Sequence, residues 1–249
     1  MIKKVVVAAA GQGTRMLKLT KNKSKHLINV NKKPFLYYLL SNLIFAGYKD
    51  FYFVVGYRAD LFEDFFSQFK KEKKINNIKI NLVNQYEILG PKEKIYGTAC
   101  PIMCLKDIIK EDFVVLYGDN LYSPKDLKKI GSIDKFNFVT GIFSEHPEKY
   151  GVLRTEGEFL KEIVEKPEKF ISNLINCGLY KFTPEIFDKV FKIKKSKRGE
   201  YELTDAINLL AKENKVKVIQ IQDYWIDFGN PGDILKVAKF LKKKKIKII

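Results

Sequence analysis

The first 120 residues alternate strand patterns with helix patterns, and this alternation limits the folds open to the chain. The strand patterns are short apolar runs at residues 3–9, 51–55, 78–83 and 113–117. Amphipathic helix patterns at residues 34–47, 61–69 and 97–109 follow the first three of them. Parallel strands need crossover connections of this kind, and such connections are almost always right-handed. The order therefore predicts an α/β, Rossmann-like doubly wound sheet that is mainly parallel and flanked by helices.

The second half of the chain is richer in strand patterns. They lie at residues 136–143, 151–155, 159–164 and 175–182, with a hairpin turn at 155–158, and helix patterns lie at 184–191, 203–213 and 231–241. The sheet is therefore expected to be mixed. We see no linker, internal repeat or low-complexity segment. We expect one domain over residues 1–249, with halves at 1–120 and 121–230 and a C-terminal helix with a basic tail at 231–249.

Composition excludes several classes of protein. Hydrophobic residues make up 46% of the chain and aromatic residues 13%, which supports a packed core and excludes a disordered chain. The longest apolar runs are far shorter than the roughly 20 residues that span a bilayer, and the N-terminus lacks a signal-peptide pattern. We therefore expect a cytoplasmic protein without a membrane partner. The three cysteines are too few for a disulfide framework, and we interpret them as buried thiols.

The formal net charge of +17 raises the question of a polyanionic partner such as nucleic acid. Only four of the 46 basic residues are arginines, although proteins that read nucleic acids rely on arginine for bidentate contacts. The lysines are spread over helix faces and the C-terminal tail, and no nucleic-acid-binding motif is present. Composition therefore disfavours a nucleic-acid partner, and polyanion binding stays as an alternative. The oligomeric state, a homo-oligomer included, is left open.

A glycine-rich turn follows the first strand pattern. Gly11 and Gly13 would let the backbone approach a phosphate closely, and successive N–H groups could cradle it. The turn is not a dinucleotide fingerprint, because Met16 stands where a third glycine is required. It also lacks the Gly-Lys-Ser/Thr end of a phosphate-binding P-loop. Arg15 and Lys25 supply cations for a triphosphate, and the alternative is a plain tight turn.

Carboxylates stand in two places suited to a metal ion. Asp119 follows the fourth strand pattern, where side chains face the ligand crevice of an open α/β sheet. Asp227 lies among apolar residues, although it is also explained as a turn aspartate before Gly229. Oxygen ligands of this kind suit Mg²⁺. The spacing between Asp119 and Asp227 in the sequence is not by itself evidence for a metal site.

The second half holds three further polar segments. Glu165 and Lys166 end an apolar strand pattern, which indicates either a structural ion pair or contacts to hydroxyls and a phosphate. Asn176 and Gly178 lie within a strand pattern, where a glycine indicates close approach to the backbone. The segment 200–205 is otherwise explained as a helix start.

In this order, the segments resemble the sugar-1-phosphate nucleotidyltransferase family, in particular its enzymes that join UTP or dTTP to glucose 1-phosphate. The matching stretches are residues 9–17, 24–25, 33–34, 97–99, 118–120, 150–152, 165–167, 176–180, 200–205 and 225–231. Many relatives have Pro-Lys where Ser24-Lys25 stands, and a proline where Lys18 stands. The segment 85–96 is longer than the usual link between base-reading segments.

The resemblance implies a single nucleotidyltransferase domain of the GT-A-like kind, with Mg²⁺ as cofactor and a nucleoside triphosphate and a sugar 1-phosphate as substrates. Residues 1–120 would form the nucleotide-binding half and 121–230 the sugar-phosphate-binding half. The implied nucleotide-binding residues are Ala10, Gly11, Gly13, Thr14, Arg15, Lys25, Gln85, Gly97 and Thr98. The implied sugar-phosphate-binding residues are Tyr150, Gly151, Glu165, Lys166 and Asn176. Asp119 and Asp227 would hold the metal, and the catalytic set would be Arg15, Lys25, Asp119, Lys166 and Asp227.

The resemblance favours UTP or dTTP with glucose 1-phosphate. Alternatives are GTP with a mannose- or heptose-type 1-phosphate, a non-sugar phosphate such as phosphocholine, and a catalytically silent subunit of the same fold. A polyanion-binding protein is the alternative outside this class.

Overall fold

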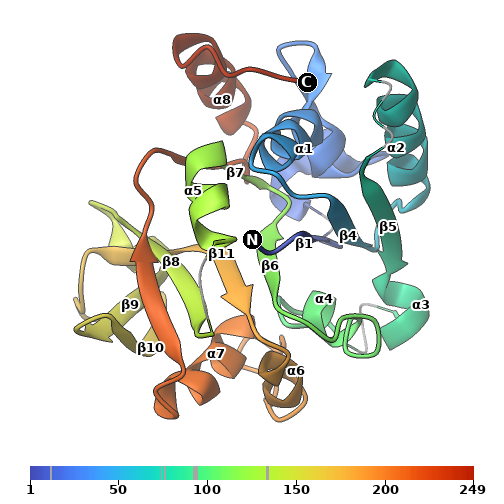
Figure 1. Ribbon diagram of the computed structural model, residues 1–249. Helices are drawn as coiled ribbons and strands as arrows, with labels where there is room; N and C mark the ends of the chain where they lie inside the picture. The colour runs from blue at the N-terminus through green and yellow to red at the C-terminus, as the bar shows by residue number, and fades with distance from the viewer. Residues whose placement is uncertain (12, 74, 76, 92–94, 133–134) are drawn as a thin grey trace. The chain divides into compact units, whose positions relative to one another are not determined.

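The computed structural model describes residues 1–249 except 12, 74, 76, 92–94 and 133–134 (Figure 1). The chain forms two compact units. The N-terminal unit contains Lys3–Asn84, Leu116–Lys129 and Asp223–Ile249. The central unit contains Met1–Ile2, Gln85–Val115 and Ile130–Gln222. Among the described residues, no helix is long and apolar enough to cross a membrane.

The N-terminal unit is built on parallel strands in the order β5-β4-β1 (Figure 1). These strands are β1 (Lys4–Ala9), β4 (Asp50–Val55) and β5 (Lys79–Asn84). Val5, Val6 and Val7 are fully buried, as expected for a strand covered on both faces. The last residues of β6 (Phe113–Tyr117) enter this unit, and the N–H of Gly118 donates to the carbonyl of Ala8 at 2.9 Å. The carboxyl ends of β1 and β6 therefore lie together.

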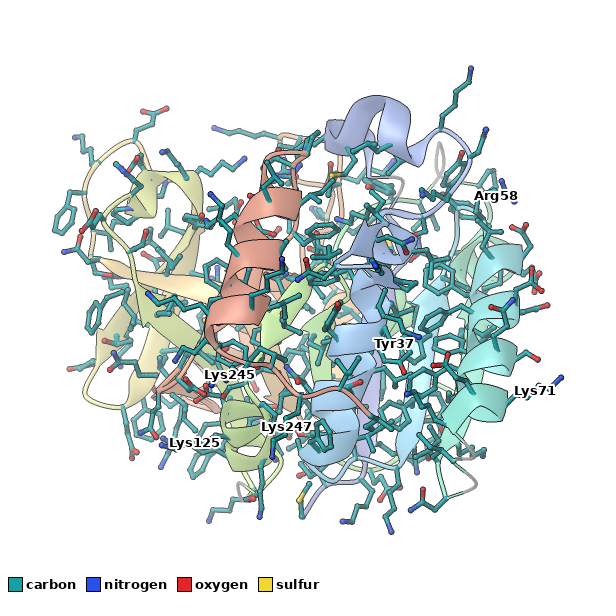
Figure 2. All side chains as sticks on the ribbon, turned by 90° about the horizontal axis from the view of Figure 1, so that it is seen from above. Tyr37, Arg58, Lys71, Lys125, Lys245 and Lys247 are labelled. Carbon is teal, nitrogen blue, oxygen red and sulfur yellow. The ribbon has the colours of Figure 1, made fainter. Side chains whose placement is uncertain are left out.

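Two helices cover this sheet: α1 (Phe35–Phe45), which is buried over almost its whole length, and the amphipathic α2 (Asp60–Lys73). Phe66 of α2 packs on Phe53 of β4, and Tyr37 of α1 contacts Phe69 of α2. Figure 2 shows Tyr37 between the two helices. The Tyr37 hydroxyl also donates to the backbone carbonyl of Ile249 at 3.0 Å, which fixes the end of the chain beside α1. The other elements are η1 (Thr14–Thr20), η2 (Lys25–Leu27), β2 (Asn29–Val30), β3 (Lys33–Pro34), β7 (Asn120–Tyr122), α5 (Pro124–Ile130), β13 (Trp225–Asp227) and α8 (Asp233–Lys243).

The central unit is built on strands in the order β11-β8-β12-β10-β9. These are β8 (Asn137–Phe143), β9 (Gly151–Glu156), β10 (Phe159–Glu165), β11 (Leu174–Phe182) and β12 (Val216–Gln220). Neighbours are antiparallel except β12 and β8, so the expected mixed sheet is observed. The helices are α3 (Gln85–Leu89), α4 (Cys100–Met103), η3 (Pro147–Lys149), α6 (Glu185–Val190) and α7 (Leu203–Lys212).

Helix α7 is joined to strand β10 by a side-chain clamp. Asn208 Oδ1 accepts from the N–H of Ile163 at 2.7 Å, and Asn208 Nδ2 donates to the carbonyl of Ile163 at 2.9 Å. The single asparagine thus satisfies both backbone groups of Ile163. The clamp fixes the strand whose last residue is Glu165.

The helix predicted over residues 97–109 is wrong in its length. Only Cys100–Met103 is α-helical, and the following N–H groups of Leu105 and Ile108 bond three residues back instead of four. Gly97, at a φ of 138°, excludes a helix before this turn. The 3₁₀ turns and the short ladder between β7 and β13 were not predicted from the sequence. All three cysteines are buried free thiols, as predicted.

Candidate active site

Four of the five predicted catalytic residues lie in the N-terminal unit, and the structure brings them together. Asp119 follows β6, and Lys25 at the start of η2 forms an ion pair with Asp119 Oδ2. Asp227 ends β13, whose antiparallel pairing with β7 places it opposite Asn120. Arg15 is exposed on η1, and its Nη1 lies 3.6 Å from the point where a Cβ on Gly229 would stand, beside the Asp227 carboxylate. Two carboxylates and two cations therefore meet at the ends of β6 and β13.

The glycine-rich turn needs glycine at residue 13. Gly13 has a φ of 65°, and a Cβ there would lie 3.1 Å from Cβ of Lys25. Its carbonyl accepts from the N–H of Met16 at 2.8 Å and from the Thr20 hydroxyl at 3.1 Å. Ala10 is buried, whereas the space around a Cβ on Gly11 is open. The predicted residue Thr14 begins η1, and its side chain lies outside the described part of the structure.

The electrostatics of the two carboxylates differ. Burial is the largest influence and opposes the ionisation of Asp119, but the charge of Lys25, its hydrogen bond and the other neighbouring groups together outweigh burial, and the pKa of Asp119 is lowered. For Asp227, burial and then the neighbouring charge of Asp119 raise the pKa to about 6. Two mutually repelling carboxylates in a partly buried place fit a divalent cation, which would hold both in the ionised form.

The donor set fits Mg²⁺ better than a metal enclosed by protein ligands. In the described residues no group of three or more His, Cys, Asp or Glu side chains is arranged around one point. Asp119 and Asp227 would supply two oxygen ligands, and phosphate oxygens and water the others, which is the usual arrangement for Mg²⁺ in phosphate chemistry.

His26 belongs to the surroundings of Asp119, and sequence reasoning did not identify it. Its ring is buried, and Nδ1 lies 2.6 Å from the Ser24 hydroxyl oxygen, which is also buried. A Cβ on Gly118 would lie 2.9 Å from Cδ2 of this ring. Burial, and then the charge of Lys25, lower the pKa of His26 to about 3, so the imidazole is neutral. The His26 ring therefore packs against the backbone that carries Asp119, next to Lys25.

The five predicted sugar-phosphate-binding residues lie close together in the central unit. Gly151 begins β9 and faces Glu165 across the β9–β10 ladder, where a Cβ on Gly151 would lie 3.0 Å from Glu165 Oε2. The same Cβ would lie 3.8 Å from Cβ of Asn176. The N–H of Lys166 donates to the carbonyl of Tyr150 at 3.0 Å.

The backbone is left-handed at two places in and beside this group. Lys166 has a φ of 44° directly before Pro167, an uncommon conformation for a residue other than glycine. Asn176 accepts from the N–H of Gly178 at 3.0 Å and donates to the Tyr180 hydroxyl at 2.7 Å, across a bulge where Gly178 has a φ of 73°. The surrounding hydrogen bonds thus hold Lys166 and Asn176 in fixed places.

Arg198 is a second residue that sequence reasoning missed. Its guanidinium lies 3.7 Å from Glu165 and 3.6 Å from both Glu200 and Glu202. Burial raises the pKa of Glu165, and Arg198 opposes that rise. Glu200 and Glu202 are near Arg198 in the sequence, but no local pattern marks the contact with Glu165, which lies far from Arg198 along the chain.

The predicted base-binding residues occupy a different part of the central unit. Gln85 begins α3 and is only 2% exposed, and its carbonyl oxygen Oε1 has no hydrogen-bond partner among the described residues. A Cβ on Gly97 would collide with the backbone of Tyr201. The Thr98 hydroxyl accepts from the N–H of Leu203 at 2.8 Å, so this side chain caps the start of α7.

The central unit also contains a cavity of about 920 Å³. Its lining includes Lys192, Lys194, Lys195, Lys212 and Asp205. None of the five predicted sugar-phosphate-binding residues lines it, so this cavity is separate from the group described above.

The chain is similar to known proteins over nearly its whole length. A family model described as nucleotidyl transferase matches residues 4–244. The chain is 36% identical over 239 residues to the bifunctional sugar-1-phosphate nucleotidylyltransferase/acetyltransferase of Sulfurisphaera tokodaii, covering 95% of this chain and 55% of that protein. It is 33% identical over 236 residues to the UTP–glucose-1-phosphate uridylyltransferase AglF of Haloferax volcanii, covering 92% of each.

A solved structure shows the same fold. The crystal structure of a UDP-glucose pyrophosphorylase complexed with UDP-glucose matches with a TM-score of 0.84 and 28% identity, over 98% of this chain and 100% of that one. The α/β fold predicted from the sequence is therefore confirmed. The chain spans about half the length of the bifunctional relatives it matches.

The raised pKa of Asp227 predicts how stability depends on pH when metal is absent. The folded chain keeps the Asp227 proton up to a pH of about 6, whereas an unfolded aspartate loses it near 3.8. Asp227 therefore contributes stability below that lower value, and this contribution is lost as the pH rises to about 6. In EDTA, the wild type should lose about 1–2 kcal/mol of unfolding free energy between pH 4 and pH 6 relative to Asp227→Asn.

Urea unfolding at each pH measures this difference, and Asp64→Asn, at an exposed carboxylate on α2, is the control. Parallel pH profiles for the wild type and Asp227→Asn would contradict the prediction.

The contact between His26 and Gly118 predicts a compensating pair of substitutions. Gly118→Ala should destabilise the chain by about 1–3 kcal/mol, because the new methyl group would displace a fully packed ring. The double variant His26→Ala, Gly118→Ala should lose less unfolding free energy than the sum of the losses in the two single variants. Gly232→Ala, where the added Cβ meets nothing within 4 Å, is the control. Additive effects in thermal unfolding would show that the two residues are not in contact.

Proposed function

The chain belongs to the nucleotidyl transferase family, and we propose that it transfers a nucleotidyl group from a nucleoside triphosphate to a sugar 1-phosphate, releasing pyrophosphate. The observation that carries the proposal is the group formed by Lys25, Asp119 and Asp227 with Arg15 beside it. Cations and paired carboxylates of this kind suit a metal-bound triphosphate. The AglF relative matches over nearly its whole length, and its name describes the same type of reaction.

The chemistry requires positioning more than proton transfer. A sugar 1-phosphate is already an ionised nucleophile at neutral pH, so no general base is needed, and His26 is unsuited to that task because its ring is buried and its pKa of about 3 makes it a weak base. The main barrier is the approach of one anion to another. Arg15 and Lys25 would offset that repulsion on the triphosphate and Lys166 on the sugar phosphate, and each charge would help to position the phosphate group that it binds.

Asp119 and Asp227 would hold Mg²⁺, which would neutralise the phosphate charge. If Asp119 held a metal ion, Lys25 Nζ would no longer have to balance that carboxylate. The ammonium group would then be available to the triphosphate. The ion pair between Lys25 and Asp119 therefore belongs to the chain without substrate.

For the sugar phosphate we assign the group in the central unit. Glu165 and Asn176 offer oxygen and amide partners for sugar hydroxyls, with Gly151 leaving room beside Glu165. Lys166 offers a charge for the phosphate, and its fixed backbone limits where that charge is held. Glucose 1-phosphate is our preferred substrate, since AglF is named for it.

For the base we assign Gln85. Its buried and unpaired Oε1 would accept a hydrogen bond from the ring N–H of uracil or thymine, and the amide NH₂ would donate to a flanking carbonyl. Cytosine has no N–H at that ring position and would leave the acceptor unpaired, at a cost of about 1–3 kcal/mol. We therefore propose UTP or dTTP, with UTP favoured.

Substitution of Lys166 tests the assignment of the sugar-phosphate group. Lys166→Gln should raise the KM for glucose 1-phosphate about tenfold or more and change the KM for the nucleotide far less, because a charged hydrogen bond to phosphate is removed. Lys169→Gln, at a nearby exposed lysine, is the control for the loss of one charge. A rise in the nucleotide KM alone would show that the two substrates have been assigned backwards.

A matrix of nucleotides tests both the reaction and the base. We expect pyrophosphate release to be fastest with UTP or dTTP, and kcat/KM for CTP, ATP and GTP to be at least about tenfold lower. Gln85→Leu should reduce the preference for UTP over CTP while leaving the fold intact. No pyrophosphate release from any combination with sugar 1-phosphates would contradict the proposed reaction. A preference for GTP or CTP would show that Gln85 is not the base reader.

A further inference from the structure

Asn120 lies beside the metal carboxylates, and neither the sequence motifs nor the proposed function gives it a role. It begins β7 directly after Asp119, is 6% exposed, and is paired with Asp227 in the β7–β13 ladder. Its side-chain Nδ2 donates to Asp119 Oδ1 at 3.1 Å. The other oxygen of that carboxylate, Oδ2, is held by Lys25. Both carboxylate oxygens of Asp119 are therefore fixed, one by each neighbour.

Trp225 determines which way the Asn120 amide faces. Its indole N–H donates to Asn120 Oδ1 at 2.7 Å. An indole nitrogen only donates, so the amide must turn its oxygen toward Trp225 and its NH₂ toward Asp119. Without this donor the amide could rotate and present its oxygen to the carboxylate, where two acceptors would repel each other. Trp225 and Asp227 are two residues apart on β13, so one strand carries a metal carboxylate and the residue that orients the other.

We propose that Asn120 is a positioning residue that orients the Asp119 carboxylate toward the metal ion, and that Trp225 holds the Asn120 amide in the orientation this requires. The inference rests on the proposed function, in which Asp119 and Asp227 bind Mg²⁺. Groups behind a metal ligand fix its orientation, and their loss commonly lowers metal affinity about 10–100-fold. In this chain two hydrogen bonds follow one another: Trp225 donates to Asn120, and Asn120 donates to Asp119.

Two variants remove the donors without adding charge. Asn120→Leu replaces the amide by an apolar group of similar size, and Trp225→Phe keeps an aromatic ring while removing the indole N–H. Asn173→Leu, at an exposed asparagine in the central unit, is the matched control. Asp119→Asn removes the proposed metal ligand itself and tests the premise.

The probe is Mn²⁺ alone, titrated into the full chain and followed by the paramagnetic resonance signal of the free ion. Asn120→Leu should weaken Mn²⁺ binding about 10–100-fold, Trp225→Phe should weaken it by a smaller factor, and Asn173→Leu should match the wild type. Trp225 is the only tryptophan of the chain, so its fluorescence gives a second readout in all variants except Trp225→Phe. Its emission should respond to Mn²⁺ in the wild type and need about 10–100-fold more in Asn120→Leu.

The outcomes separate the inference from its premise. If Asp119→Asn abolishes Mn²⁺ binding but Asn120→Leu and Trp225→Phe bind as the wild type does, the positioning role is overturned and the metal site stands. If Asp119→Asn binds Mn²⁺ normally, the metal assignment fails, and the positioning role with it. Far-ultraviolet circular dichroism checks the fold of each variant. Should Asn120→Leu not fold, Trp225→Phe decides the question, because it leaves the amide in place.

Discussion

The charge on Asp119 is the constraint around which the N-terminal unit is arranged. A carboxylate at the partly buried end of a strand is stable only if other groups balance its charge and satisfy its oxygens. The chain meets both needs from distant segments, with Lys25 from η2 and Asn120 from β7. His26 fills the space against Gly118, and Trp225 on β13 holds Asn120. The short elements η2, β7 and β13 therefore supply the side chains that stabilise the Asp119 carboxylate.

The sequence predicted the parts of the fold that depend on local patterns. Buried strands such as β1 and β6 show as continuous apolar runs, and residues at their carboxyl ends, such as Gly11 and Asp119, were expected to meet at one edge of the sheet. The helix expected over 97–109 is reduced to Cys100–Met103: the φ of Gly97 and the close approach of Tyr201 delay its start, and three-residue hydrogen bonds replace the helical ones after Met103. The contact between Gly97 and Tyr201 is tertiary, and no local pattern in the sequence indicates it.

The candidate site divides in the same way. Residues in recognisable motifs, such as Lys25 and Glu165, could be predicted from the sequence. The contact of His26 with Gly118, that of Arg198 with Glu165 and the bond between Trp225 and Asn120 could not, because each joins segments that are far apart in the sequence and no local spacing indicates it. A capping role of Thr98 was also not predicted: its hydroxyl accepts from the N–H of Leu203 at the start of α7.

The most direct test of the account is the position of the metal ion. Crystals of the chain grown with Mn²⁺ and a non-hydrolysable UTP analogue would locate the ion by anomalous scattering. The account predicts one strong peak at coordination distance, about 2.1 Å, from carboxylate oxygens of both Asp119 and Asp227. It also predicts that Asn120 Nδ2 still donates to Asp119 in that complex. A peak that contacts neither carboxylate, with nucleotide bound, would contradict the assignment of this site.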